Sequence, residues 1–165
     1  MRFKMLRSLA AAAVITTAAV ASAQSDMVLK PADVAKLLPA SVYYKGQSAP
    51  TQLRNSSGIK FSDGSYVLAT MVDNSGYSSD VAAKYQAYFV AEGPVKILGK
   101  PLPAGVYGVG AVNGKLVVTD VGGHDILTVP MTADDTIKHP LPLQILSTGG
   151  GYRLYLGRQF VTLTR

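Results

Sequence analysis

Turn-forming dipeptides divide most of this chain into short apolar runs, with a turn signal at about every ten residues. Asp63-Gly64 and Asn113-Gly114 are the strongest of these signals, because a type I′ hairpin turn needs two residues that tolerate a positive φ. The runs between such signals are too short for ordinary helices but long enough for strands. From residue 41 onward the sequence therefore predicts a series of antiparallel strands.

One segment near the N-terminus has helical spacing instead. Residues 30–38 place Pro31 in a first helical turn, with Val34 and Leu38 four positions apart on one face. Pro39 would end the helix, because proline cannot donate the next backbone hydrogen bond. A helix of two turns is not stable alone, so its apolar face is expected to pack on the strands.

Residues 79–92 fit either a helix or a strand. Asp80 is a suitable cap for a helical turn, whereas Tyr85 and Phe89 belong to an alternating pattern typical of a strand. The favoured interpretation is a capped helical turn to about Ala83, followed by a strand.

Several of the predicted strands are apolar on both faces. In residues 65–72, Val67 and Met71 point to one side and Leu68 and Val72 to the other. Both faces of the sheet must then be covered. The predicted fold class is all-β: an antiparallel sandwich or small barrel of about nine to ten short strands, with one short N-terminal helix.

The first residues have the three parts of a secretory signal peptide. Arg2, Lys4 and Arg7 precede an uninterrupted run of apolar residues and Thr, and an A-x-A site ends at Ala23. Cleavage there makes Gln24 the first mature residue. The expected organisation is a signal peptide (residues 1–23), an N-terminal segment with the short helix (24–40) and one all-β domain (41–165). We expect no transmembrane segment in the mature chain. The predicted location is periplasmic or extracellular.

Removal of that segment changes the charge of the chain. It contains three of the 16 Lys and Arg residues and none of the ten acids, so the net charge of the remaining chain is +3. The remaining basic residues are dispersed, whereas nucleic-acid binding needs a concentrated basic surface. Nucleic acid is therefore excluded as a partner. The chain has no Cys, so it must fold on its hydrophobic core without disulfides.

The segment from Asp120 to Asp125, DVGGHD, contains one of the two histidines of the chain. His124 and Asp125 would point to opposite faces of a strand, so only a pair within the turn, or His124 with Asp120, could form a dyad. A catalytic role for His124 with Asp120 or Asp125 is one hypothesis. A structural turn built on Gly122-Gly123 is the favoured one.

No motif predicts a metal or another cofactor. Structural zinc sites of the usual kind need Cys ligands, which are absent, and His124 lies fifteen residues from His139 with no metal-ligand spacing. We therefore expect no metal site and no cofactor.

Tyrosine is the most suggestive binding residue. The chain after residue 23 holds all nine Tyr and no Trp. Tyr43, Tyr85, Tyr107 and Tyr155 are the candidates for a ligand-binding surface, because tyrosine combines a large apolar ring with a polar tip. The alternative is that these residues only support strands.

The segment VKILGKPLPAGVYGVG, residues 95–110, resembles a hairpin of uncharacterised small secreted bacterial β-proteins. The shared pattern is LPAG-x-Y, carried here by Pro103, Ala104, Gly105 and Tyr107. The resemblance implies an all-β fold in which the Tyr packs inside, and it implies no activity.

These observations favour an exported β-domain that binds a small molecule, a glycan or a partner protein without catalysis. Two alternatives stay open: a small hydrolase or metal-dependent enzyme that uses His124, and a structural component of the cell envelope.

Overall fold

A computed structural model describes residues 25–165. The predicted signal peptide and its cleavage site before Gln24 lie outside these residues. The described chain is built from two antiparallel sheets and two short helices.

The larger sheet has the strand order β1-β3-β4-β5-β8-β9-β10, and β2 pairs with β3 beside this path. Every pairing in it is antiparallel. Its strands are β1 (Met27–Leu29), β2 (Ser41–Tyr44), β3 (Gln47–Lys60), β4 (Tyr66–Val72), β5 (Ala87–Ala91), β8 (Gly105–Val112), β9 (Lys115–Thr119) and β10 (Asp125–Pro130).

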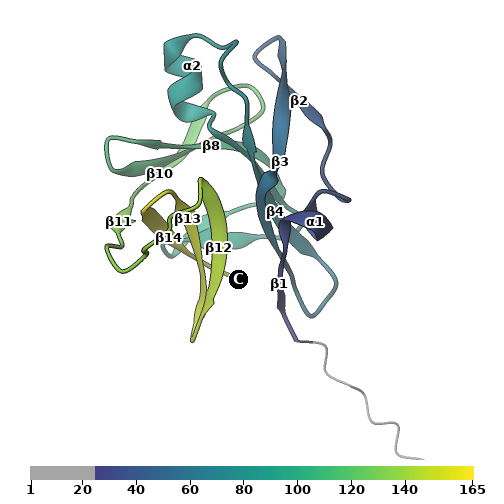
Figure 1. Ribbon diagram of the computed structural model, residues 1–165, viewed down its shortest axis with the longest axis vertical. Helices are drawn as coiled ribbons and strands as arrows, with labels where there is room; N and C mark the ends of the chain where they lie inside the picture. Colours follow the sequence, from purple (N-terminus) through teal and green to yellow (C-terminus); the bar gives the residue numbers. More distant parts are fainter. Residues whose placement is uncertain (1–24) are drawn as a thin grey trace, which may run out of the picture.

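The smaller sheet has the order β12-β13-β14-β6-β7, and β11 pairs with β14. Neither sheet closes on itself among the described residues, so the arrangement is that of a sandwich. The strands are β6 (Val95–Ile97), β7 (Lys100–Leu102), β11 (Thr132–Ala133), β12 (Leu143–Thr148), β13 (Gly151–Leu156) and β14 (Gln159–Thr164). In Figure 1, β12 of the smaller sheet lies beside β1, β3 and β4 of the larger one.

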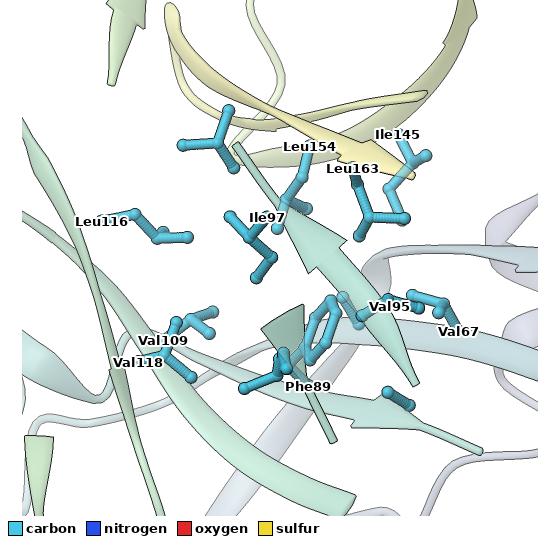
Figure 2. Packing of buried hydrophobic residues seen from close by; sticks show 14 of the residues in the cluster. Val67, Phe89, Val95, Ile97, Val109, Leu116, Val118, Ile145, Leu154 and Leu163 are labelled. Atoms are coloured by element: carbon cyan, nitrogen blue, oxygen red, sulfur yellow. The ribbon is translucent and has the colours of Figure 1, made fainter. Parts of the chain in front are cut away.

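The main hydrophobic core lies between the two sheets (Figure 2). Phe89 and Val109 of the larger sheet are fully buried against Ile97, Leu154 and Leu163 of the smaller one. The alternation predicted for β4 is confirmed, because Val67 packs in this core whereas Leu68 and Val72 belong to two other clusters on the opposite face.

The helices cover the outer face of the larger sheet (Figure 1). Helix α1 (Pro31–Val34) is followed by turns up to Leu38, so the regular helix is shorter than predicted. Val34 and Leu38 nevertheless pack on Leu68, as their spacing required.

Residues 79–92 form a helix and then a strand, as favoured from the sequence. Helix α2 (Ser79–Lys84) precedes β5. The helix lies on β8, and a Cβ atom at Gly110 would come within 2.5 Å of the Ala83 carbonyl oxygen. The glycines of β8 thus make room for the helix.

The first half of β3 lacks the apolar alternation that predicts the other strands. Residues 47–58 are mostly polar and include Pro50, which normally argues against a central strand. Pro50 fits because this end of β3 pairs with β2, and the pairing with β4 starts only at Thr51.

The LPAG-x-Y segment connects the two sheets and does not form one hairpin. Strand β6 pairs with β7, and the chain crosses at Pro103 and Ala104 into β8 of the larger sheet. Tyr107 packs in the core as the resemblance implied, and its hydroxyl donates to the Pro103 carbonyl oxygen at 2.7 Å.

Candidate functional site

The loop after β9 brings His124 and Asp120 together. The imidazole Nδ1 lies 3.0 Å from Oδ2 of Asp120, and the His124 backbone N–H donates to Oδ1 at 2.9 Å. Asp125 is directed elsewhere, since Lys84 Nζ lies 2.7 Å from its Oδ2. Gly123 has a φ of 82°, which is the positive value that the tight loop requires.

This pair lies on an open surface. The His124 side chain is 78% exposed. The pKa of Asp120 is lowered, first because the His124 backbone N–H donates to it and then because of the His124 side chain. The carboxylate therefore stabilises the loop. His124 and Asp120 line neither the cavity beside Asp26 nor the cavity beside Arg54.

The four candidate tyrosines occupy four separate environments. Tyr43 is 75% exposed on β2, and Tyr107 is buried between the sheets. Tyr155 is buried on the outer side of the smaller sheet, where its hydroxyl donates to Asp134 at 2.8 Å. The structure therefore does not bring these four residues into one cleft.

Tyr85 belongs to a buried cluster with Tyr44 and Tyr77. The rings of Tyr44 and Tyr85 are stacked with centroids 3.9 Å apart, and Tyr77 meets both edge-on. Burial raises the pKa of Tyr85 well above its ordinary value. Because Tyr44 and Tyr85 have almost no exposed surface, this cluster packs α2 and β2 onto the sheet.

Polar groups from three distant parts of the chain meet in a cavity of about 380 Å³. We call it the Asp26 cavity. It lies between Asp26, which precedes β1, and the β12–β13 hairpin, whose residues 147–151 form one wall. Phe61, Tyr152 and Arg165 line the rest together with Thr164.

Asp26 supplies an ionised carboxylate. Its Oδ1 accepts the Ser62 backbone N–H at 2.8 Å, and its Oδ2 accepts the Tyr152 hydroxyl at 2.9 Å. These two hydrogen bonds, the backbone bond first, lower the pKa of Asp26. A carboxylate offers about four acceptor positions, so acceptor capacity remains for a ligand.

Arg165 supplies the opposite charge. Its Nη2 lies 2.6 Å from Asp63 Oδ2 and donates to Ser65 Oγ at 2.9 Å, while the guanidinium lies 4.3 Å from the centre of the Phe61 ring. The hydrogen bond from Arg165 is the largest cause of an Asp63 pKa well below its usual range. The stacked guanidinium keeps further N–H groups available beyond those two contacts.

The Tyr152 hydroxyl stays protonated in this setting. Burial first, and then the hydrogen bond to Asp26, raise the pKa of Tyr152 to about 12. At neutral pH the cavity thus presents a carboxylate, a guanidinium and hydroxyl groups in fixed protonation states. Such a set can bind a polar molecule, but none of these groups is poised to exchange a proton near pH 7.

Sequence reasoning did not find this cavity. Asp26 and Arg165 lie near opposite ends of the chain, and the TGGG segment, residues 148–151, is typical of a turn between strands. Three consecutive glycines exceed what a two-residue hairpin needs, which was the one available signal.

The described residues contain no group of three or more His, Cys, Asp and Glu side chains that could hold a metal ion. In the same part of the chain, no helix has the length and apolar character to cross a membrane.

Comparisons of the chain with protein-family models, with curated proteins and with solved structures give no match.

Proposed function

We propose that this protein is an exported binding module without catalytic activity, and that the Asp26 cavity binds a small hydroxyl-rich molecule such as a mono- or disaccharide. The observation that carries the proposal is the convergence of Asp26, Tyr152 and Arg165 on one cavity. Its volume of about 380 Å³ lies within the range of small-molecule sites.

The chemistry of the cavity favours a ligand with many hydroxyl groups. A hydroxyl group both donates and accepts, so neighbouring hydroxyls can donate to the free positions of Asp26 and accept from Arg165. Ser147 and Thr148 add further hydroxyls to the wall. A ligand with a single strong charge would leave either the carboxylate or the guanidinium opposed to a like charge.

A titration followed by amide NMR tests the proposal, with glucose, N-acetylglucosamine and maltose as separate probes. We expect saturable shifts centred on residues 147–152 for at least one sugar. Asp26→Asn should weaken that binding by about tenfold or more, because a charge-assisted hydrogen bond is lost. Absence of saturable shifts with all three sugars would contradict the proposal.

Gly150 allows a blocking variant with a matched control. A Cβ atom at Gly149 or Gly150 meets nothing within 4 Å, and neither residue has a positive φ. Gly150→Trp should therefore fill the cavity mouth without disturbing the fold and abolish binding. Gly149→Ala should bind as the wild type does.

The hydrogen-bonded pair of His124 and Asp120 favours a second candidate, a small hydrolase. A carboxylate that holds one imidazole nitrogen leaves the other free to act as a general base. If this candidate is correct, any hydrolytic activity of the purified protein is lost in His124→Ala while its thermal stability is unchanged.

Export is proposed on the pattern of residues 1–23. Mass spectrometry of the protein recovered from the cell envelope or the medium should give a chain that begins at Gln24, within a residue or two. An intact Met1 terminus would refute it.

A further inference from the structure

A second cavity, of about 210 Å³, lies at the open edge of the sandwich. We call it the Arg54 groove. One wall is β12 with Leu143, Ile145 and Leu146, and the opposite wall combines the β1 residues Val28 and Leu29 with a part of β3. Its interior is therefore mostly apolar and separate from the Asp26 cavity.

A bulge in β3 forms part of this wall. The register with β4 shifts between Gln52 and Ser56, so residues 53–55 leave the ladder. The bulge is held by local hydrogen bonds: Ser56 Oγ donates to the Leu53 carbonyl oxygen, and Asn55 Nδ2 donates to Gln52 Oε1. Bulges commonly redirect side chains at functional edges, and this one places Arg54 at the groove.

The polar groups of Ser57 and Ile145 inside the groove already have partners. The Ile145 backbone N–H donates to Ser57 Oγ at 3.1 Å and so joins the two sheets at this edge. Because this strand-edge donor is used, an added peptide strand would find no N–H at Ile145. The inner surface therefore offers mainly apolar contacts.

The charges at the groove all have one sign. Lys30 and Arg54 line it, neither forms an ion pair within residues 25–165, and none of its lining residues is acidic. An apolar interior beside two cations is complementary to a molecule with a hydrocarbon chain and one carboxylate.

We propose that the Arg54 groove binds a medium-chain carboxylate, with the chain against the part-exposed side chains of Val28, Leu141 and Leu146 and the carboxylate at Arg54 and Lys30. This site is independent of the sugar-binding function proposed for the Asp26 cavity.

Isothermal titration calorimetry and amide NMR on the purified protein test the site, with octanoate as the probe. We expect octanoate to bind with shifts at β12 and β1. Hexanoate, which has two fewer methylenes, should bind about fifteenfold more weakly, because each methylene contributes about fourfold in affinity. Equal affinity for octanoate and uncharged 1-octanol would overturn the proposal, as would shifts confined to the Asp26 cavity.

Charge variants separate the role of Arg54 from general attraction to a basic protein. Arg54→Gln and Lys30→Gln should each weaken octanoate by about fivefold or more while binding of 1-octanol is unchanged. Lys115→Gln, in the exposed β8–β9 hairpin, removes the same charge elsewhere and should leave octanoate binding as in wild type. If Lys115→Gln lost as much octanoate affinity as Arg54→Gln, the proposed site would be wrong. Tighter binding of an acetylated Glu-Leu-Glu-Leu peptide than of octanoate would also overturn the proposal.

Discussion

At the scale of single residues, Tyr43 and Tyr44 show how alternation along β2 decides the role of a side chain. Tyr43 is 75% exposed, whereas Tyr44 is 5% exposed and stacks on Tyr85. The Tyr44 hydroxyl donates to Thr119 Oγ1 at 3.1 Å. The sequence identified Tyr43 as a candidate binding residue but could not show which tyrosine hydroxyls were already used by internal hydrogen bonds.

This contrast gives a matched pair of variants. Tyr44→Phe removes a buried hydrogen bond and should lower the free energy of unfolding by about 1 kcal/mol. Tyr43→Phe, at an exposed position, should change it by less than about 0.5 kcal/mol. Urea unfolding measures both values, and equal effects would show that burial does not separate the two residues.

The pair of Asp26 and Tyr152 makes a prediction about titration. Replacement of Asp26 by Asn removes the hydrogen bond to a negative carboxylate, which is the second cause of the raised Tyr152 pKa. The pKa of Tyr152 should then fall from about 12 but stay above its ordinary value of 10, because burial is the larger cause. Tyrosine ring ¹³C NMR at a series of pH values measures this pKa. An unchanged Tyr152 pKa in Asp26→Asn would show that the two groups are not coupled.

At the scale of elements, the turn signals and alternation predicted most strands of the structure. The short segments β1, β7 and β11 contain only two or three residues, too few for alternation to be visible. The polar first half of β3 was missed for a different reason: its strand conformation is fixed by the pairing with β2, a tertiary effect that local sequence does not report.

Glycines of β8 allow α2 and the tyrosine cluster to approach the sheet. A Cβ atom at Gly108 would collide with the Tyr85 ring and come within 2.7 Å of Thr119 Oγ1. Gly108→Ala should therefore displace Tyr85 and lower stability by about 1–3 kcal/mol.

The control for this variant is Gly149→Ala, because a Cβ atom there meets nothing within 4 Å. Its thermal unfolding midpoint should stay close to that of the wild type. If Gly108→Ala were as stable as Gly149→Ala, the proposed crowding at β8 would be wrong.

At the scale of the whole molecule, two-faced strands predicted a sandwich or a small barrel, and the division of strands between the two sheets was not visible in the sequence. Strands β6 and β7 lie between β5 and β8 in sequence but belong to the other sheet. The Asp26 cavity depends on that division, because it joins Asp26 to residues of β13 and the end of β14. Contacts at this separation follow from the complete topology, so sequence spacing could not predict the site.

The hydrogen bonds and ion pairs of three Asp side chains predict an acid-dependent loss of stability. The pKa values of Asp26, Asp63 and Asp134 are all lowered in the folded state. A lowered pKa means that the group stabilises the fold above its unfolded pKa, near 3.8, and that this contribution is lost as pH falls through the folded value.

Asp63→Asn tests this dependence. The variant should be less stable than the wild type at about pH 6, and the difference should shrink toward about pH 2, where the wild-type carboxyl begins to be protonated. Thermal unfolding at both pH values measures it. A stability difference of the same size at both pH values would show that the Asp63 charge does not contribute to the stability of the fold.

The most direct measurement of the proposed binding function is native mass spectrometry of the protein purified from its own host, compared with Gly150→Trp and Gly149→Ala prepared in parallel. We predict that wild type and Gly149→Ala carry the same added mass, that of a small hydroxyl-rich molecule, and that Gly150→Trp carries none. The same added mass on Gly150→Trp would contradict binding in the Asp26 cavity.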